Sequence, residues 1–249
     1  MAQFLFITDL DHTLVGDDRA LAILNQRLSQ HRDEYGSIIV YSTGRSPTLY
    51  QQLRHEQEMI DPDYAVLSVG TLIYPGNSAV SLPEWNEYLS DGWDRDALVA
   101  IAAQFSDLVP QPDSEQTPHK ISYYLDEAIA PDILLQLETG LKQQGWTVQI
   151  IYSAGQDLDI LPQRGNKGAA VQFLQETLAI APERTVVCGD SGNDLSMFTP
   201  KRSKGIIVGN AKPELRQWYE TTSPDHVYLA TGHCSNGILE GLQSLGFLD

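Results

Sequence analysis

Two aspartates spaced two residues apart follow an apolar run near the start of the chain. Phe4 to Ile7 is continuously apolar, and Asp9, Asp11 and Thr13 come directly after it. Two carboxylates and a hydroxyl group this close together repel one another unless a cation joins them, and hard oxygen ligands with room for water suit Mg²⁺. The pattern therefore predicts a cation site just beyond the end of a buried strand.

Two other interpretations of this first motif must be weighed. Asp-x-Asp-x-Thr also opens a calcium-binding loop, but that loop needs Gly at its sixth position and Glu at its twelfth, where this chain has Leu14 and Ala20. Calcium is therefore excluded. An acidic turn after a strand remains open for this motif taken alone.

A second apolar run, Thr185 to Cys188, also ends in glycine and carboxylates. The residues that follow are Gly189-Asp190-Ser191-Gly192-Asn193-Asp194. Gly-Asp-Ser-Gly is also the nucleophile loop of trypsin-like proteases. Those enzymes are paired β-barrels whose His precedes the Ser, whereas this chain alternates strands with helices and His233 follows Ser191. The protease interpretation is therefore disfavoured.

Two further segments have the character of anion sites. Thr43 and Gly44 lie between the strand-like run Ser37 to Tyr41 and a helix that begins with Ser46 as its cap and Pro47. Lys167 lies at the start of another helix, where lysine is disfavoured by the helix dipole unless an anion is near. An ordinary turn and a surface lysine are the alternatives that these segments leave open.

These residues need strands and helices to position them. Apolar spacing predicts helices over Ala20 to Gln30 and after Gly168, and apolar runs predict strands that alternate with them. We therefore expect an α/β fold with a Rossmann-like parallel-sheet core, in which residues that follow the strands gather at one edge.

The pattern changes between residues 83 and 163. This stretch is richer in Trp and Tyr, and it predicts helices around Trp93 to Phe105 and Pro131 to Gln144 with strands between and after them. We expect a separate α+β module there, inserted into a core made of residues 1–82 and 164–249.

Composition limits the partners and the compartment. A formal net charge of −17 argues against nucleic acids and anionic membrane surfaces, because both need a positive footprint. The two cysteines, Cys188 and Cys234, form no disulfide framework, which suits a reducing cytoplasm. No segment has the length of a signal sequence or a membrane span.

Along the chain the four segments come in the order Asp9-x-Asp11-x-Thr13, Thr43-Gly44-Arg45, Lys167 and Gly189 to Asp194. Taken together in that order, they resemble the haloacid-dehalogenase-like phosphatase superfamily, and the inserted module resembles its type IIB cap. The runs Lys120 to Tyr123, Leu158 to Lys167 and Val187 to Asp194 are similar to those of cyanobacterial sucrose-phosphate phosphatases, a family within it. The resemblance implies hydrolysis of sucrose 6-phosphate in the last step of sucrose synthesis. Mannosylglycerate or glucosylglycerate phosphate are alternative substrates, and a sucrose-phosphate synthase is the protein partner that the resemblance suggests.

The resemblance also implies a role for each motif residue. Asp9 would be the nucleophile that forms an aspartyl-phosphate, and Asp11 the general acid and base. The Mg²⁺ ligands would come from Asp9, the backbone of Asp11, Asp190 and, in support, Asp194. Phosphate would be held by Thr43, Gly44, Lys167 and Asn193. The cap would contact the sugar through Lys120, Tyr123, Asp157, Asp159 and Gln163.

Two other functions remain as alternatives. A phosphomutase would use the same phosphoenzyme and return its phosphate to a substrate. A binding module without activity would be expected to lose the nucleophile or the lysine, whereas Asp9, Asp11, Lys167 and Asp190 are all present here.

Overall fold

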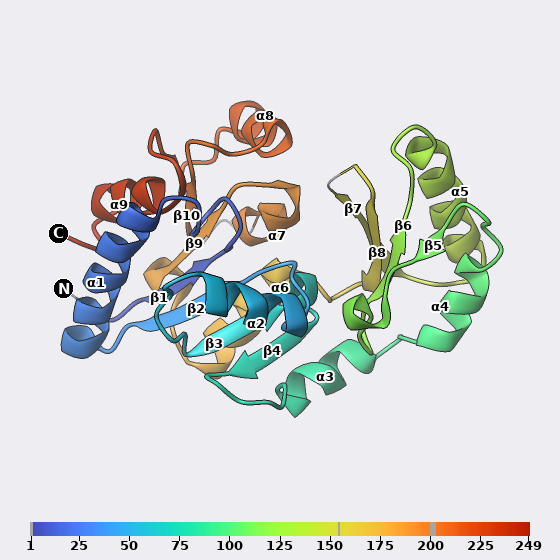
Figure 1. The fold of residues 1–249 in the computed structure, drawn as a ribbon, viewed down its shortest axis with the longest axis horizontal. Coiled ribbons are helices and arrows are strands. Elements are labelled where there is room, and N and C mark those ends of the chain that lie inside the picture. The colour runs from blue at the N-terminus through green and yellow to red at the C-terminus, as the bar shows by residue number, and fades with distance from the viewer. Residues whose placement is uncertain (1, 154, 200–202) are drawn as a thin grey trace.

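A computed structural model of the 249-residue chain describes residues 2–153, 155–199 and 203–249. In these ranges the chain forms two sheets, each with helices packed against it (Figure 1). The two ends of the chain build the larger sheet, and its middle builds the smaller one. We call them, with their helices, the core domain and the cap.

Strand β1 (Leu5–Thr8) lies at the centre of the core sheet. Among the described residues this sheet has seven strands in the order β11-β10-β9-β1-β2-β3-β4, and all neighbours are parallel except β3 with β4. The other strands are β2 (Ile38–Ser42), β3 (Tyr64–Leu67), β4 (Leu72–Pro75), β9 (Thr185–Gly189), β10 (Lys204–Ile207) and β11 (Val227–Leu229). Every residue of β1 is buried, as a strand covered on both faces requires. The predicted α/β fold with a parallel-sheet core is confirmed.

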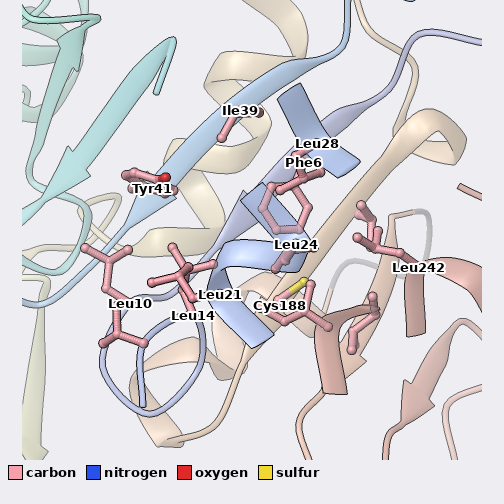
Figure 2. Packing of buried hydrophobic residues seen from close by; sticks show 14 of the residues in the cluster. Phe6, Leu10, Leu14, Leu21, Leu24, Leu28, Ile39, Tyr41, Cys188 and Leu242 are labelled. Carbon is pink, nitrogen blue, oxygen red and sulfur yellow. The ribbon is translucent and has the colours of Figure 1, made fainter. Parts of the chain in front are cut away.

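Helices cover both faces of the core sheet. One face packs against α1 (Asp18–Tyr35), α2 (Pro47–Glu56) and α9 (Cys234–Ser244). The other packs against α3 (Pro83–Ser90), α6 (Lys167–Thr177), α7 (Leu195–Phe198) and α8 (Pro213–Thr222). Figure 2 shows the first layer, where Phe6 and Cys188 of the sheet meet Leu24 and Leu28 of α1 and Leu242 of α9.

Capping residues set the limits of the helices. Helix α1 is longer than the predicted Ala20 to Gln30, because the Asp17 carboxylate accepts a hydrogen bond from the Ala20 N–H and the helix continues to Gly36. Gly36 ends it in the left-handed conformation, at a φ of 73°. Helix α2 begins as predicted, with Ser46 as its cap and Pro47 in its first turn.

The cap is an antiparallel sheet with helices on one side. In the described residues its strands run in the order β5-β6-β8-β7, and α4 (Arg95–Ala102) and α5 (Ala130–Gln143) cover the face turned away from the core domain (Figure 1). The strands are β5 (Val109–Pro110), β6 (Ile121–Tyr124), β7 (Val148–Ser153) and β8 (Asp157–Pro162). The opposite face of this sheet is therefore available to face the core domain.

Helix α3 connects the two parts and packs with the core domain. Trp85 and Leu89 are fully buried in a core-domain cluster, and the Trp85 indole N–H donates to the Gly70 carbonyl at 3.1 Å. The division at residues 83 and 163 stays a prediction. The packing of α3 favours a cap that begins after Ser90.

Two further observations concern the chain as a whole. The helices in the described residues include none long and apolar enough to cross a membrane. Cys188 and Cys234 are both buried and free, in agreement with the prediction that they form no disulfide framework.

Candidate active site

The carboxyl ends of β1, β2 and β9 meet at one edge of the core sheet. Thr8 of β1 pairs with Cys188 of β9, so Asp9 and Asp190 leave the sheet close to each other. Thr43 follows β2, which pairs with β1 on its other side. Three of the four predicted strand-end and helix-start segments therefore converge here because β1 has both of these strands as neighbours.

Lys167 places an ammonium group beneath this edge. Its Nζ donates to Asp9 Oδ1 at 2.6 Å, to Asp194 Oδ1 at 2.6 Å and to Asn193 Oδ1 at 3.2 Å, and its side chain is fully buried. Lys167 is therefore not a surface residue, although it begins α6. All its described bonds go to side chains of the protein, so direct contact between Lys167 and phosphate stays a prediction.

Two glycines allow this close packing. Gly70 has a φ of 99°, and a Cβ there would lie 2.3 Å from the backbone of Asn166, the residue that caps the helix starting at Lys167. A Cβ on Gly189 would lie 2.6 Å from the Asp194 side chain. Any larger residue at either position would displace the buried lysine or its carboxylate partner.

The buried carboxylates outnumber the positive charge beside them. Oxygens of Asp9, Asp190 and Asp194 lie within 4.8 Å of one another, and Lys167 is paired with two of these carboxylates, Asp9 and Asp194. Burial raises the pKa of Asp9 to about 8; the nearby charges of Asp194 and Asp190 add to this and Lys167 opposes it. Burial by itself lowers the pKa of Lys167, but Asp194 and Asp9 outweigh it and raise that pKa. A further cation would relieve this imbalance.

The carboxylate oxygens differ in what they are free to bind. Asp194 Oδ1 accepts from Lys167, and its Oδ2 accepts from the N–H groups of Asp190 at 3.0 Å and Ser191 at 3.1 Å. Asp190 Oδ1 accepts from Thr13, whereas Oδ2 of Asp9 and of Asp190 accepts no hydrogen bond from the described residues. Asp9 and Asp190 thus offer the hard oxygen donors that a divalent cation prefers, with Asp194 holding them from behind.

Asp11 has a partner that sequence reasoning missed. Arg45 Nε donates to Asp11 Oδ2 at 2.8 Å, and its second nitrogen donates to Asp11 Oδ1 at 2.7 Å. This two-point contact occupies both oxygens of the Asp11 carboxyl group in this conformation. The role of Asp11 as general acid and base stays a prediction.

A cavity of about 290 Å³ lies between this sheet edge and the cap. On the core side, the predicted residues that line it are Asp9, Asp11, Thr43, Gly44, Asp190 and Asn193. On the cap side they are Lys120, Asp157 and Asp159. Polar side chains of both the core domain and the cap therefore face the same cavity.

Two predicted sugar contacts are not brought to this cavity. Side chains alternate between the two faces of a strand. Lys120, which directly precedes β6, and Ser122 therefore lie on one face, and Lys120 lines the cavity. Tyr123 lies on the other face and packs into the apolar cluster beneath α4 and α5. Gln163 is exposed and lines a different hollow, beside Arg164. Choosing Lys120 and Tyr123 together ignored the period of two.

The cap side of the cavity contains a buried polar cluster. Lys120 Nζ donates to Ser122 Oγ at 2.7 Å and to Asp159 Oδ1 at 3.2 Å, and Ser122 Oγ donates to Asp159 Oδ1 at 2.6 Å. All three side chains are buried. Alternation along β6, applied from Lys120, would have indicated Ser122.

Other lining residues gave no clear signal in the sequence. Gln111 and Glu115 come from the loop between β5 and β6, and Lys212 caps α8 next to Asp190. Gln111 donates to Asp157 Oδ1 at 2.9 Å, and the Lys212 N–H donates to the Asp190 carbonyl at 2.7 Å. Loop and helix-cap positions like these become neighbours only through the fold.

Several known proteins are similar to this chain in sequence, and a solved structure is similar to it in fold. The chain is 40% identical to sucrose-phosphatase 2 of Nicotiana tabacum over 251 residues, which cover 97% of this chain and 59% of the tobacco protein. It is 31% identical to the mannosylfructose-phosphate phosphatase of Agrobacterium fabrum, over 97% of this chain and 96% of that protein. The X-ray structure of the sucrose-phosphatase from Synechocystis, in complex with sucrose and phosphate, superposes with a TM-score of 0.90 at 43% identity and covers 99% of both chains.

The parallel sheet with its strand-end carboxylates, buried lysine and inserted cap defines a member of the haloacid-dehalogenase-like superfamily. Within that class, the family model of the sucrose-6F-phosphate phosphohydrolases matches residues 2–246. The chain belongs to this family. It spans about three-fifths of the length of the plant relatives it matches, 59% for the tobacco protein.

Proposed function

We propose that this chain is a Mg²⁺-dependent phosphatase that hydrolyses sucrose 6-phosphate to sucrose and phosphate, the last step of sucrose synthesis. The observation that carries the proposal is the position of Asp9. It follows the central strand, is bonded to Lys167 at 2.6 Å and faces a cavity closed by the cap. Membership of the sucrose-6F-phosphate phosphohydrolase family supports the choice of substrate.

In the first step, Asp9 acts as the nucleophile. A carboxylate oxygen of Asp9 attacks phosphorus, the bond from phosphorus to the sugar oxygen breaks, and an aspartyl-phosphate forms. The Lys167 ammonium at 2.6 Å opposes the effect of burial on the pKa of Asp9, and the positive charge of a bound Mg²⁺ would favour the ionised carboxylate further. In the second step water attacks phosphorus and the bond to Asp9 breaks.

Mg²⁺ would be held by Asp9, Asp190 and the backbone of Asp11, with Asp194 supporting Asp190 and Lys167. When bound, it supplies positive charge against the phosphoryl oxygens. The donor set fits this role because Asp9 and Asp190 each keep an oxygen that no described residue engages.

Asp11 is the general acid and base in this proposal. It gives a proton to the departing sugar oxygen, then takes one from the attacking water. Arg45 must release the Asp11 carboxylate before that carboxyl can donate a proton, because both its oxygens accept from the guanidinium here. An incoming phosphate offers Arg45 an alternative anion, so binding and release can occur together.

The phosphoryl group would lie between Thr43, Gly44 and Asn193, which line the core end of the cavity. The sugar would contact Lys120, Asp157 and Asp159 at the cap end. Every phosphate ester presents the same phosphoryl group, so discrimination must come from the cap. A disaccharide offers more hydroxyl groups to the polar side chains at the cap end than a monosaccharide does. A smaller sugar would therefore make fewer hydrogen bonds with these partly buried groups.

The experiment that tests the proposal measures kcat/KM side by side on several phosphate esters. We expect sucrose 6-phosphate to exceed glucose 6-phosphate and fructose 6-phosphate by roughly a hundredfold, the effect of losing about two buried hydrogen bonds. Mannosylfructose phosphate belongs in the panel because a relative of 31% identity is named for it, and mannosylglycerate and glucosylglycerate phosphates because the motifs allow them. A preference for any of these would reject sucrose 6-phosphate as the substrate and keep the phosphatase chemistry.

A phosphomutase is the second candidate within the same chemistry. It would form a bisphosphate intermediate, so radiolabelled phosphoenzyme mixed with unlabelled sugar phosphate separates the two activities. Association with a sucrose-phosphate synthase and a cytoplasmic location are further parts of the proposal. The free, buried cysteines agree with a reducing compartment.

A further inference from the structure

A hydrogen bond joins the cap to the core domain at a residue that lines the cavity, away from the linkers. Ser46 Oγ donates to Glu115 Oε1 at 3.0 Å, across 69 residues of sequence. Ser46 caps α2 in the core domain, and Glu115 ends the short 3₁₀ turn Asp113–Glu115 in the cap. The other described hydrogen bonds and ion pairs between the two parts involve residues at the linkers, such as Arg164 with Asp91.

On the core side, this contact lies next to the proposed phosphate site. Ser46 directly follows Thr43-Gly44-Arg45, and the Arg45 N–H donates to Thr43 Oγ1 at 3.1 Å. Arg45 also holds Asp11. A cap residue that fixes Ser46 therefore fixes the end of the segment that carries both groups.

On the cap side, Glu115 is joined to the buried polar cluster. Ser122 Oγ lies 3.3 Å from the Glu115 carbonyl oxygen and 2.6 Å from Asp159 Oδ1, while Lys120 donates to the same hydroxyl. Of these residues, Glu115, Lys120 and Asp159 line the cap end of the cavity. A rearrangement of the cluster around a sugar can thus move Glu115.

We propose that the Glu115–Ser46 hydrogen bond is a latch that holds the cap over the Thr43-Gly44-Arg45 segment, with Glu115 as a positioning residue. The carboxylate lies at the N-terminal end of α2, where the helix dipole and the Ser46 hydroxyl both favour a negative charge. The latch couples the sugar end of the cavity to the phosphate end, and this second part rests on the proposed function.

The latch is tested first by a distance that needs no substrate. Spin labels are placed through Ile23→Cys on α1 and Leu135→Cys on α5, two exposed positions in the core domain and the cap. We expect one narrow distance distribution for the otherwise unchanged chain and a longer, broader one for Glu115→Ala. Ser114→Ala is the matched control, because Ser114 Oγ donates to the same Glu115 oxygen, at 3.3 Å, from within the cap.

A double-mutant cycle then tests the coupling to activity. Ser46→Ala, Glu115→Ala and the double variant are compared by kcat/KM on sucrose 6-phosphate and on 4-nitrophenyl phosphate, which carries no sugar. Ser46→Ala also removes the cap of α2, but that loss occurs in both arms of the cycle and cancels. We expect a coupling of about tenfold on the sugar phosphate, the scale of one hydrogen bond to a charged group, and a smaller one on the aryl ester.

The outcomes separate the latch from the proposed function. Unchanged distance distributions in Glu115→Ala, or strictly additive effects on both substrates, would overturn the latch. If the unmodified chain does not hydrolyse sucrose 6-phosphate, the proposed function fails, while the distance measurement and the cycle on 4-nitrophenyl phosphate still decide the latch. A change equal in size for Ser114→Ala would assign the effect to the cap loop and overturn the contact with Ser46.

Discussion

Lys167 and Asp194 form a fully buried ion pair: Nζ lies 2.6 Å from Oδ1, and neither side chain is exposed. Asp194 also accepts from the N–H groups of Asp190 and Ser191. This pair holds the lysine against the proposed nucleophile and the turn after β9 against the sheet. Its loss should therefore affect folding as well as activity.

We expect Asp194→Asn to lower the free energy of unfolding by about 3 kcal/mol or more, because it leaves a buried ammonium with one fewer anionic partner. Urea unfolding followed by circular dichroism measures the change. Asp91→Asn is the control, because Asp91 pairs with Arg164 at the surface, where such pairs contribute about 1 kcal/mol or less. Equal losses in the two variants would contradict the assigned role.

Asp9→Asn and Asp11→Asn should differ in kind. An amide cannot act as the anionic nucleophile, so Asp9→Asn should lose more than about a hundredfold in kcat. Asp11→Asn should still form phosphoenzyme from 4-nitrophenyl phosphate, whose leaving group needs no proton, and hydrolyse it slowly. Rapid-quench measurement of the phosphoenzyme separates the two. Retention of more than about a tenth of kcat by Asp9→Asn would mean that another residue is the nucleophile.

Activity should depend on Mg²⁺ and disappear in excess chelator. Asp190→Ala should raise the Mg²⁺ concentration needed for half-maximal activity by about tenfold or more, because it removes a charged oxygen donor. A second readout is the melting temperature, which Mg²⁺ should raise in the unmodified chain more than in Asp190→Ala, since binding to the folded state stabilises it. Full activity of protein verified as metal-free would reject the metal requirement.

Substitutions at cap residues that line the cavity should lower kcat/KM more than substitutions at cap residues that lie outside it. We expect Lys120→Met to lower kcat/KM on sucrose 6-phosphate by about tenfold or more, because Asp159 loses its cationic partner and a sugar hydroxyl loses a donor, and to change 4-nitrophenyl phosphate hydrolysis less. Gln163→Ala is the matched control, because Gln163 lies in a different hollow. If Gln163→Ala had the larger effect, the cap surface assigned to the sugar would be wrong.

Glu240 should make stability depend on acid pH. Partial burial alone would raise its pKa, but hydrogen bonds from the N–H groups of Thr231 at 3.0 Å and Gly232 at 2.7 Å, and from the Tyr228 hydroxyl, lower that pKa to about 2. A carboxyl group with a lowered folded-state pKa stabilises the fold above its usual pKa of 4.5, and this contribution disappears as the pH falls from there towards 2.

Glu240→Gln should therefore cost about 1 kcal/mol at pH 7, a value kept small because solvent screens a partly exposed carboxylate, and the cost should vanish near pH 2. Melting curves from pH 2 to pH 7 measure it. Glu183→Gln, at an exposed position without a described hydrogen bond, serves as control. A cost for Glu240→Gln that does not change with pH would contradict the electrostatic explanation.

The sequence alone determined the class of fold and the core of the site. Phe4 to Ile7 and Thr185 to Cys188 do not alternate between polar and apolar residues. Such continuous runs are typical of a parallel strand that is covered on both faces. Residues after such strands must gather at one sheet edge. The convergence of Asp9, Thr43 and Asp190 could therefore be predicted without coordinates.

Tertiary structure decided the contacts that depend on register and on distant loops. The packing of the cap sheet on α4 and α5 decides which face of β6 is turned to the cavity, and the close approach of Gly70 to Asn166 accompanies the burial of Lys167. Arg45 meets Asp11 across 34 residues, and Glu115 meets Ser46 across 69. Such pairs have no local pattern in the sequence, because their geometry is set by how whole elements pack, and only the folded chain decides which side chains are neighbours.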